Sequence, residues 1–243
     1  MSVALITGGS RGIGAATARH LARAGHDIAV AYQSNAESAE RVVAAVREIG
    51  PRAGAFAADL ADVDAAEGLI DAVEADLGPI DILILNAGVN SPQQTDVRKV
   101  SIADWNRFMA INLRAPFIAA RRVIGGMIDR TFGRIVFVSS VAAYTGGIVG
   151  PHYAASKAGL HGLAHSLSQM GAPHGVTVNV VAPALVETDM LPNDPDSQAR
   201  LSSRIPVGRL GQADEVADLI AAIVRNAYLT NQSILIDGGM RPS

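Results

Sequence analysis

The chain has no cysteine, which excludes disulfides, thiolate nucleophiles and cysteine-ligated zinc. It also lacks any apolar run approaching the roughly 18 residues of a membrane-spanning helix. No charged leader or cleavage signal precedes the first apolar segment, Val3–Ile6. We therefore expect a soluble, cytoplasmic protein.

An excess of charge of one sign is missing too. The 20 basic and 23 acidic side chains leave a formal net charge of -3, which argues against a dedicated nucleic-acid binder. Lysine is rare, because only Lys99 and Lys157 accompany 18 arginines. With 49% hydrophobic residues, the 243-residue chain can bury a large core as a single domain, residues 1–243.

Short aliphatic runs alternate with longer segments of helical period, a pattern typical of an α/β protein with a parallel sheet covered by helices on both faces. The expected strands are Val3–Thr7, Ile28–Tyr32, Ala53–Ala57, Ile80–Leu85, Ile135–Ser139, Val176–Val181 and Ile234–Ile236. The expected helices are Gly12–Ala24, Ala36–Ile49, Val63–Asp76, Asp104–Arg130, Tyr153–Met170 and Ala213–Arg225.

Prolines predict two irregularities. Pro116 falls inside the long fourth helix and removes a backbone donor, so we expect a kink near Asn112. Pro192 and Pro195 interrupt residues 187–206, which we interpret as an irregular substrate lid.

A glycine-rich turn, Gly8–Gly14, ends the first strand and opens the first helix. Its glycines permit close backbone approach, and the helix N-terminus offers free N–H groups to a phosphate. The second strand ends in Tyr32-Gln33-Ser34-Asn35, without the acid that holds the ribose hydroxyl of NAD. Because Arg11 supplies a cation instead, we predict a preference for NADP(H) over NAD(H).

Other functions remain open for these segments. The sequence around Ser10 also fits the nucleophile turn of α/β-hydrolases, although no earlier strand exists to supply the second oxyanion donor. His161 and His165 have the spacing of two helical metal ligands but lack a third, so we expect no metal site and place them at the surface or a subunit interface.

Tyr153 and Lys157 lie four residues apart, which puts the phenol and the ammonium on one helical face. A nearby cation favours phenolate and makes a tyrosine more useful as a general acid or base. Such pairs also occur as ordinary amphipathic surface, so the rest of the chain must decide.

The motifs occur in a specific order: the glycine turn, Asn86-Ala87-Gly88, Ser140, then Tyr153 with Lys157. Together they resemble the short-chain dehydrogenase/reductase family over essentially the whole chain. The resemblance implies a Rossmann-type doubly wound fold and hydride transfer to or from a nicotinamide. It makes Tyr153 the proton donor to a carbonyl oxygen that Ser140 holds. It gives Lys157 the tasks of lowering the Tyr153 pKa and binding the nicotinamide ribose, and it gives Asn112 that of positioning water for a proton relay.

The same resemblance, with the glycine-turn argument, predicts the residues that contact the cofactor. They are Gly8, Ser10, Arg11, Gly12, Ile13, Gly14, Tyr32, Gln33, Ser34, Asn35, Asp59, Leu60, Asn86, Ala87, Gly88, Tyr153, Lys157, Pro183, Val186 and Thr188.

Within the family the chain is most similar to 3-oxoacyl-[acyl-carrier-protein] reductases, through residues 10–14, 205–209 and 237–240. This implies an acyl-thioester substrate, a role in fatty acid biosynthesis, possible docking of an acyl carrier protein and a homotetramer. His174 stands where such reductases often carry an arginine thought to dock the carrier. Two alternatives are a family member acting on another ketone or secondary alcohol and a cofactor-sensing regulator without turnover.

Overall fold

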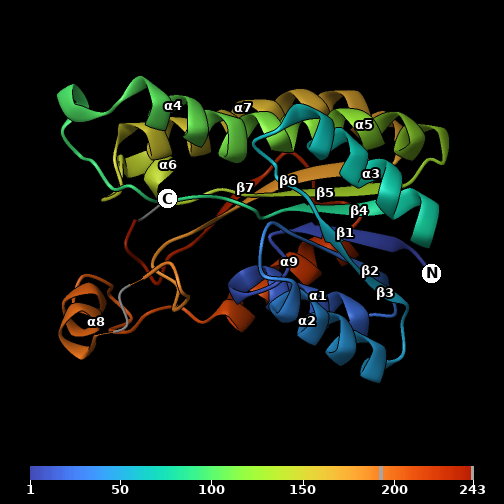
Figure 1. Cartoon of the computed structure of the whole chain (residues 1–243), viewed down its shortest axis with the longest axis horizontal. Helices are drawn as coiled ribbons and strands as arrows, with labels where there is room; N and C mark the ends of the chain where they lie inside the picture. Colours follow the sequence, from blue (N-terminus) through green and yellow to red (C-terminus); the bar gives the residue numbers. More distant parts are fainter. Residues whose placement is uncertain (192–193, 242–243) are drawn as a thin grey trace.

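One all-parallel sheet of seven strands organises the computed structural model, which describes residues 1–191 and 194–241. The strand order is β3-β2-β1-β4-β5-β6-β7, which confirms the predicted Rossmann-type fold (Figure 1). The strands are β1 Val3–Thr7, β2 Asp27–Tyr32, β3 Ala53–Ala57, β4 Ile80–Leu85, β5 Gly133–Val138, β6 Val176–Pro183 and β7 Ser233–Ile236.

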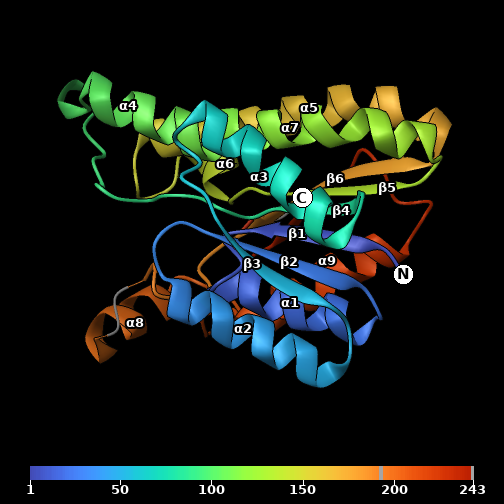
Figure 2. The same cartoon turned by 45° about the vertical axis from the view of Figure 1, so that its right-hand side comes forward.

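Helices cover both faces of this sheet. Figures 1 and 2 show α3, α4, α5 and α7 on one face and α1, α2 and α9 on the other. The helices are α1 Gly12–Arg23, α2 Ala36–Ile49, α3 Val63–Leu77, α4 Ile102–Met109, α5 Ala115–Asp129, α6 Ala142–Thr145, α7 Pro151–Gly171, α8 Pro195–Ser202 and α9 Ala213–Arg225. Short 3-10 turns lie at Val97–Lys99 and Ala172–His174.

The inner strands are buried on both faces, because successive side chains point to opposite sides and helices cover each side, whereas the edge strands β3 and β7 are only partly buried. Val3 and Leu5 of β1 pack into the cluster beneath α3, α5 and α7. Ala4 and Ile6 pack into the cluster formed with α1, α2 and α9. This explains why the strands are continuous apolar runs in the sequence.

The expected helix Asp104–Arg130 is wrong as a single element. It is divided into α4 and α5 by a π-helical turn, Ala110–Arg114. Pro116 then lies in the first turn of α5, where a missing N–H costs no intrahelical hydrogen bond. The irregularity expected near Asn112 is therefore present as a π turn, a feature that often marks functional sites.

The expectation of a wholly irregular segment 187–206 also needs correction. Residues Pro195–Ser202 form the helix α8, whose N-cap Asp194 accepts a hydrogen bond from the Ser197 N–H at 2.8 Å. Pro195 is in the first turn, where it favours a helix start. Pro192 and Asn193, part of the expected lid, lie outside the described residues.

β1 pairs with β2 on one side and with β4 on the other, both in parallel. The order of the strands along the sheet therefore reverses at β1, because β2 and β3 are added on one side and β4 to β7 on the other. In open parallel sheets, ligands bind beyond the carboxyl ends of the strands at such a reversal. This is where the glycine turn and the Asn86 segment meet. No helix in the described part of the chain combines the length and apolar character needed to cross a membrane.

Candidate functional site

A cavity of about 750 Å³ opens at the carboxyl ends of the strands. Its lining includes every residue predicted to contact the cofactor except Gly14, and it includes Ser140, Tyr153 and Lys157. Fold topology therefore gathers segments that are far apart in the sequence around one space. Asn112 does not line the cavity.

Asn86 fixes the glycine turn to the neighbouring strand. Its side-chain N–H₂ donates to the carbonyls of Thr7 and Gly8, both at 3.1 Å. The Thr7 hydroxyl accepts the backbone N–H groups of Asn86 and Ala87 at 3.0 and 3.1 Å. These four bonds join the ends of β1 and β4 at the point where the sheet order reverses.

Three residues of the turn must be glycine, two because of their backbone φ and one because a Cβ has no space. Gly8 and Gly12 have φ of +63° and +51°, which L side chains rarely adopt. At Gly14 a Cβ would lie 2.3 Å from the Gly8 carbonyl oxygen and 2.7 Å from Asn86 Nδ2. The absence of a Cβ at Gly14 therefore allows α1 to pack closely against Gly8 and Asn86.

The N-terminus of α1 is open toward this cavity. Its N-cap Arg11 makes no capping hydrogen bond and no acid lies in the first turn, whereas the side chains of Asn35 and Asp62 cap α2 and α3. Uncapped N–H groups and the positive end of the helix dipole suit an anionic group. The cradle therefore fits the pyrophosphate of a dinucleotide.

Arg11 extends from the turn and pairs with Asp189 at 3.5 Å, both side chains being 69% exposed. An ion pair this exposed contributes little to stability, so a phosphate can replace the carboxylate at small cost. At the end of β2, Gln33 donates to Asp59 at 3.2 Å, which brings one carboxylate into this end of the cavity. Asp59 follows β3, as the family resemblance predicts.

The reactive end of the cavity combines Ser140, Tyr153 and Lys157. Lys157 is fully buried in practice, 4% exposed, and its Nζ donates to the Val138 carbonyl at 2.8 Å. Burial without an acidic partner lowers the pKa of Lys157 to about 8. Its Nζ lies 5.9 Å from the centroid of the Tyr153 ring.

The Ser140 side chain acts on the Tyr153 phenol and favours its ionised form. Burial raises the pKa of Tyr153, and the Ser140 side chain only partly offsets that effect. The expected lowering of this pKa by Lys157 is therefore wrong in net direction, because desolvation of the phenolate dominates. A phenol with a raised pKa keeps its proton at neutral pH.

Asn112 is fully buried in the π turn behind the cavity. Its Oδ1 accepts from the Val89 N–H at 2.9 Å, and its Nδ2 donates to the Val89 carbonyl and to Ser156 Oγ, both at 3.1 Å. The side chain thus joins the segment after β4 to α7. Its role in a proton relay stays a prediction.

His161 and His165 of α7 differ in their surroundings, and only His165 is exposed as expected. His161 is partly buried and hydrogen-bonds Ser139 and Ser233, each at 2.9 Å. His165 is close to Asn231 in an exposed position. Among the described residues no group of three or more His, Asp or Glu side chains could hold a metal ion.

Sequence analysis missed part of the substrate end. Helix α6 and the segment before α7 contribute Thr145, Ile148 and Val149. The lid and the C-terminal segment contribute Arg204 and Met240. Only Arg204 carried a signal, as a cation within the predicted lid. The others lie in the short helix α6 or in loops, whose paths the sequence does not specify.

The family model described as short chain dehydrogenase matches residues 2–199 of the chain. The chain belongs to the short-chain dehydrogenase family. Its members share the topology and the ordered motifs described above, and this family membership makes the protein an oxidoreductase that interconverts CH–OH and C=O groups with a nicotinamide cofactor.

Similar proteins cover nearly the whole chain. The acetoacetyl-CoA reductase of Shinella zoogloeoides is 38% identical over 241 residues, 98% of this chain and 97% of the relative. The 3-oxoacyl-[acyl-carrier-protein] reductase of Escherichia coli is 34% identical, over 98% and 96% of the two chains. A blue fluorescent protein from a metagenomic library, solved in complex with NADPH, superposes with a TM-score of 0.90 at 35% identity, over 99% and 98% of the chains.

The tight contact behind Gly14 predicts that Gly14→Ala disrupts the site. The new Cβ meets backbone rather than a flexible side chain, so we expect a loss of about 1–3 kcal/mol of stability and weaker NADPH binding. Chemical denaturation and calorimetric titration measure the two effects. Gly68→Ala in α3 is the control, because its Cβ meets nothing within 4 Å and should stabilise the helix. Equal behaviour of the two variants would contradict the packing argument.

Proposed function

We propose that the protein is an NADPH-dependent reductase of 3-oxoacyl thioesters, with Tyr153 as the proton donor. The observation that carries this proposal is the common location of Ser140, Tyr153 and Lys157 in the cavity that begins at the glycine turn. The relatives named as acetoacetyl-CoA and 3-oxoacyl-[acyl-carrier-protein] reductases support the choice of substrate class. A ketone or secondary alcohol of another kind is the alternative within the same chemistry.

The residues of the cavity suit a dinucleotide from end to end. The glycine turn and the open N-terminus of α1 hold the pyrophosphate, and Arg11 with Ser34 and Asn35 holds the 2'-phosphate. Asp59 and Leu60 would hold the adenine, residues Asn86–Gly88 the ribose, and Pro183, Val186 and Thr188 the carboxamide. When bound, the reduced nicotinamide supplies a hydride to the substrate carbonyl carbon.

The protein's own groups deliver the proton and stabilise the developing oxyanion. Ser140 donates a hydrogen bond to the carbonyl oxygen, and Tyr153 transfers its phenolic proton to the same oxygen. The ammonium of Lys157 stabilises the tyrosinate left behind and binds the nicotinamide ribose. The raised pKa of Tyr153 ensures that the proton is present before reaction.

The substrate end of the cavity is mostly apolar. It is lined by Val141, Ile148, Val149, Leu185, Met190, Leu191 and Met240. Such a surface accepts an acyl chain and excludes water from the reacting carbonyl. Residues 187–191 and 194–206 belong to the proposed lid over it.

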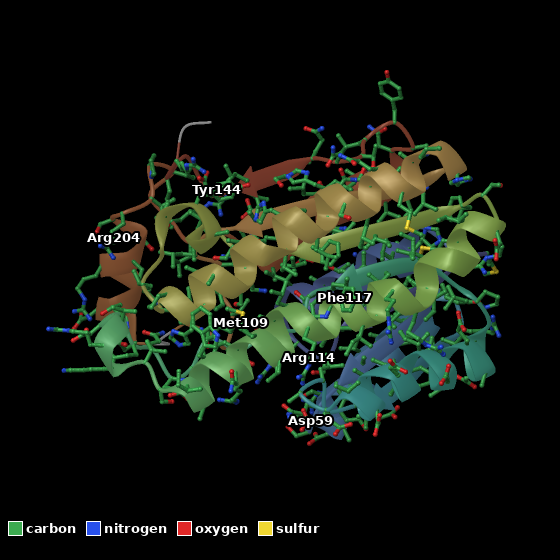
Figure 3. All side chains as sticks on the ribbon, turned by 90° about the horizontal axis from the view of Figure 1, so that it is seen from above. Asp59, Met109, Arg114, Phe117, Tyr144 and Arg204 are labelled. Carbon is green, nitrogen blue, oxygen red and sulfur yellow. The ribbon has the colours of Figure 1, made fainter. Side chains whose placement is uncertain are left out.

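An acyl carrier protein that presents the thioester to this cavity is a further proposal. We also propose a homotetramer. Phe117 of α5 is 45% exposed and Met170 of α7 is 51% exposed, so both helices carry apolar side chains on their outer faces. Figure 3 shows Phe117 and Met109 along the outer row formed by α4 and α5.

Tyr153→Phe removes the proton donor and retains the ring. We expect NADPH oxidation with acetoacetyl-CoA to fall by about 10²- to 10⁴-fold, with NADPH binding retained in a calorimetric titration. Tyr144→Phe is the control, because Tyr144 lies on α6 and does not line the cavity. Undiminished turnover by Tyr153→Phe would refute the assignment of the proton donor.

The lowered pKa of Lys157 predicts how the rate of reduction depends on pH. The ammonium is charged below its pKa of about 8 and neutral above it, so kcat/KM for reduction should be constant below pH 8 and fall above it. Tyr153, whose pKa is raised, stays protonated across this range. The profile is measured by stopped-flow or steady-state NADPH oxidation. A rate that rises through pH 8 would contradict this sign.

Arg11→Gln tests the proposed recognition of the 2'-phosphate. Losing a charge-assisted hydrogen bond should weaken NADPH binding by about tenfold, and the ratio of NADPH to NADH affinity should fall by the same factor. Arg23→Gln at the other end of α1 is the matched control. Calorimetric titrations with both nucleotides give the ratios, and an unchanged ratio in Arg11→Gln would assign the preference elsewhere.

A further inference from the structure

One charged side chain that lines the cavity, that of Arg204, has no partner among the described residues. Five charged residues line it: Arg11, Asp59, Lys157, Asp189 and Arg204. The first four have partners, since Arg11 pairs with Asp189, Asp59 accepts from Gln33 and Ala61, and Lys157 donates to Val138. Within residues 1–191 and 194–241, the side chain of Arg204 has no hydrogen bond or ion pair.

The backbone at Arg204 is nevertheless well anchored. Its N–H donates to the Leu201 carbonyl at 3.1 Å, which ends the turn after α8. The next residue, Ile205, is 5% exposed and packs against Gly238 so closely that a Cβ there would lie 2.5 Å from Ile205 Cγ2. Val207 N–H donates to the Gly238 carbonyl at 3.1 Å. The guanidinium therefore extends from a fixed base.

Arg204 also lies at the end of the cavity opposite the nucleotide. Figure 3 shows Arg204 at the end of α8, well separated from Asp59, which marks the proposed adenosine end. Figure 1 shows α8 apart from both helical layers, on the side toward which the strands point. The lining of the same cavity includes the apolar side chains of Leu191 and Met240.

From this arrangement we propose that Arg204 is a specificity residue that binds an anionic group at the far end of the substrate. This inference rests on the proposed ketone reductase function. It defines the preferred substrate as a carbonyl compound with an apolar middle and a terminal phosphate or carboxylate. The phosphates of a pantetheine-type thioester and the carboxylate of an oxo acid share this chemistry, and a guanidinium binds either with paired hydrogen bonds.

The test compares substrates that differ in the terminal anion. Acetoacetyl-CoA carries phosphates, whereas the N-acetylcysteamine thioester of acetoacetate is the same ketone without them. We expect wild type to prefer the CoA thioester in kcat/KM, and Arg204→Gln to reduce this preference by about tenfold, mainly through KM. Arg204→Lys should retain most of the preference, because the charge remains.

Arg200→Gln provides the matched control. Arg200 is an exposed arginine of α8 that donates to Ser197 and does not line the cavity. Its substitution should leave the preference unchanged. The proposal would be overturned if the preferences for the CoA thioester and for levulinate both survived in Arg204→Gln, or if they fell equally in Arg200→Gln. Equal use of the two thioesters by wild type together with equal use of levulinate and its methyl ester would also overturn it.

Levulinate and its methyl ester distinguish the source of the anion. A preference for levulinate that Arg204→Gln removes assigns the site to a substrate carboxylate, whereas a loss confined to the CoA thioester assigns it to phosphate. Both results support the anion site.

Binding without turnover separates this proposal from the proposed function. Calorimetric titration of CoA into the protein with NADP⁺ should give an affinity about tenfold weaker in Arg204→Gln than in wild type, and the difference should shrink at high salt. If wild type reduces neither thioester but this difference is observed, the thioester reductase function fails and the anion site stands. If reduction proceeds and Arg204→Gln changes neither CoA binding nor the preference for levulinate, the anion site fails and the reductase stands.

Discussion

The hydrogen bonds that join Asn86 to Thr7 and Gly8 connect the ends of β1 and β4. At this point the order in which strands are added to the parallel sheet changes from one side of β1 to the other. Without these hydrogen bonds the glycine turn after β1 and the loop after β4 would be independent, and the cavity between them would have no fixed width. The same fixed turn leaves the N-terminus of α1 open and presents Arg11 to the nucleotide end. The position of the whole site thus follows from one polar contact between neighbouring strand ends.

A second constraint is the burial of Lys157. Its ammonium is removed from water and compensated by a carbonyl, not by a carboxylate, so the charge remains available for a neighbouring tyrosinate and its pKa is lowered to about 8. Burial acts on Tyr153 in the opposite sense, since it raises the pKa of the phenol. One environment therefore keeps a proton on the group proposed to donate it and places a cation where negative charge will develop.

The lid connects the two ends of the cavity. Asp189 pairs with Arg11 at the nucleotide end, Asn90 donates to the Met190 carbonyl at 3.2 Å, and Arg204 lines the substrate end. The segment proposed as the lid therefore carries charged groups at both ends of the cavity. The proposed roles of Arg11 and Arg204 are separable by mutation, because the two side chains share no partner among residues 1–191 and 194–241.

The sequence by itself determined the fold class, the strands and the ordered motifs, because buried parallel strands require continuous apolar runs and a phosphate-binding turn requires glycine. It also located the irregularity near Asn112 through Pro116. Tertiary structure alone decided that this irregularity is a π turn, that Asn112 binds Val89 and Ser156 behind the cavity, and that part of the lid is helical. It also decided the net direction of the Tyr153 pKa and the isolation of Arg204. Burial and charge pairing depend on neighbours distant in sequence, and no local pattern encodes which of them come together.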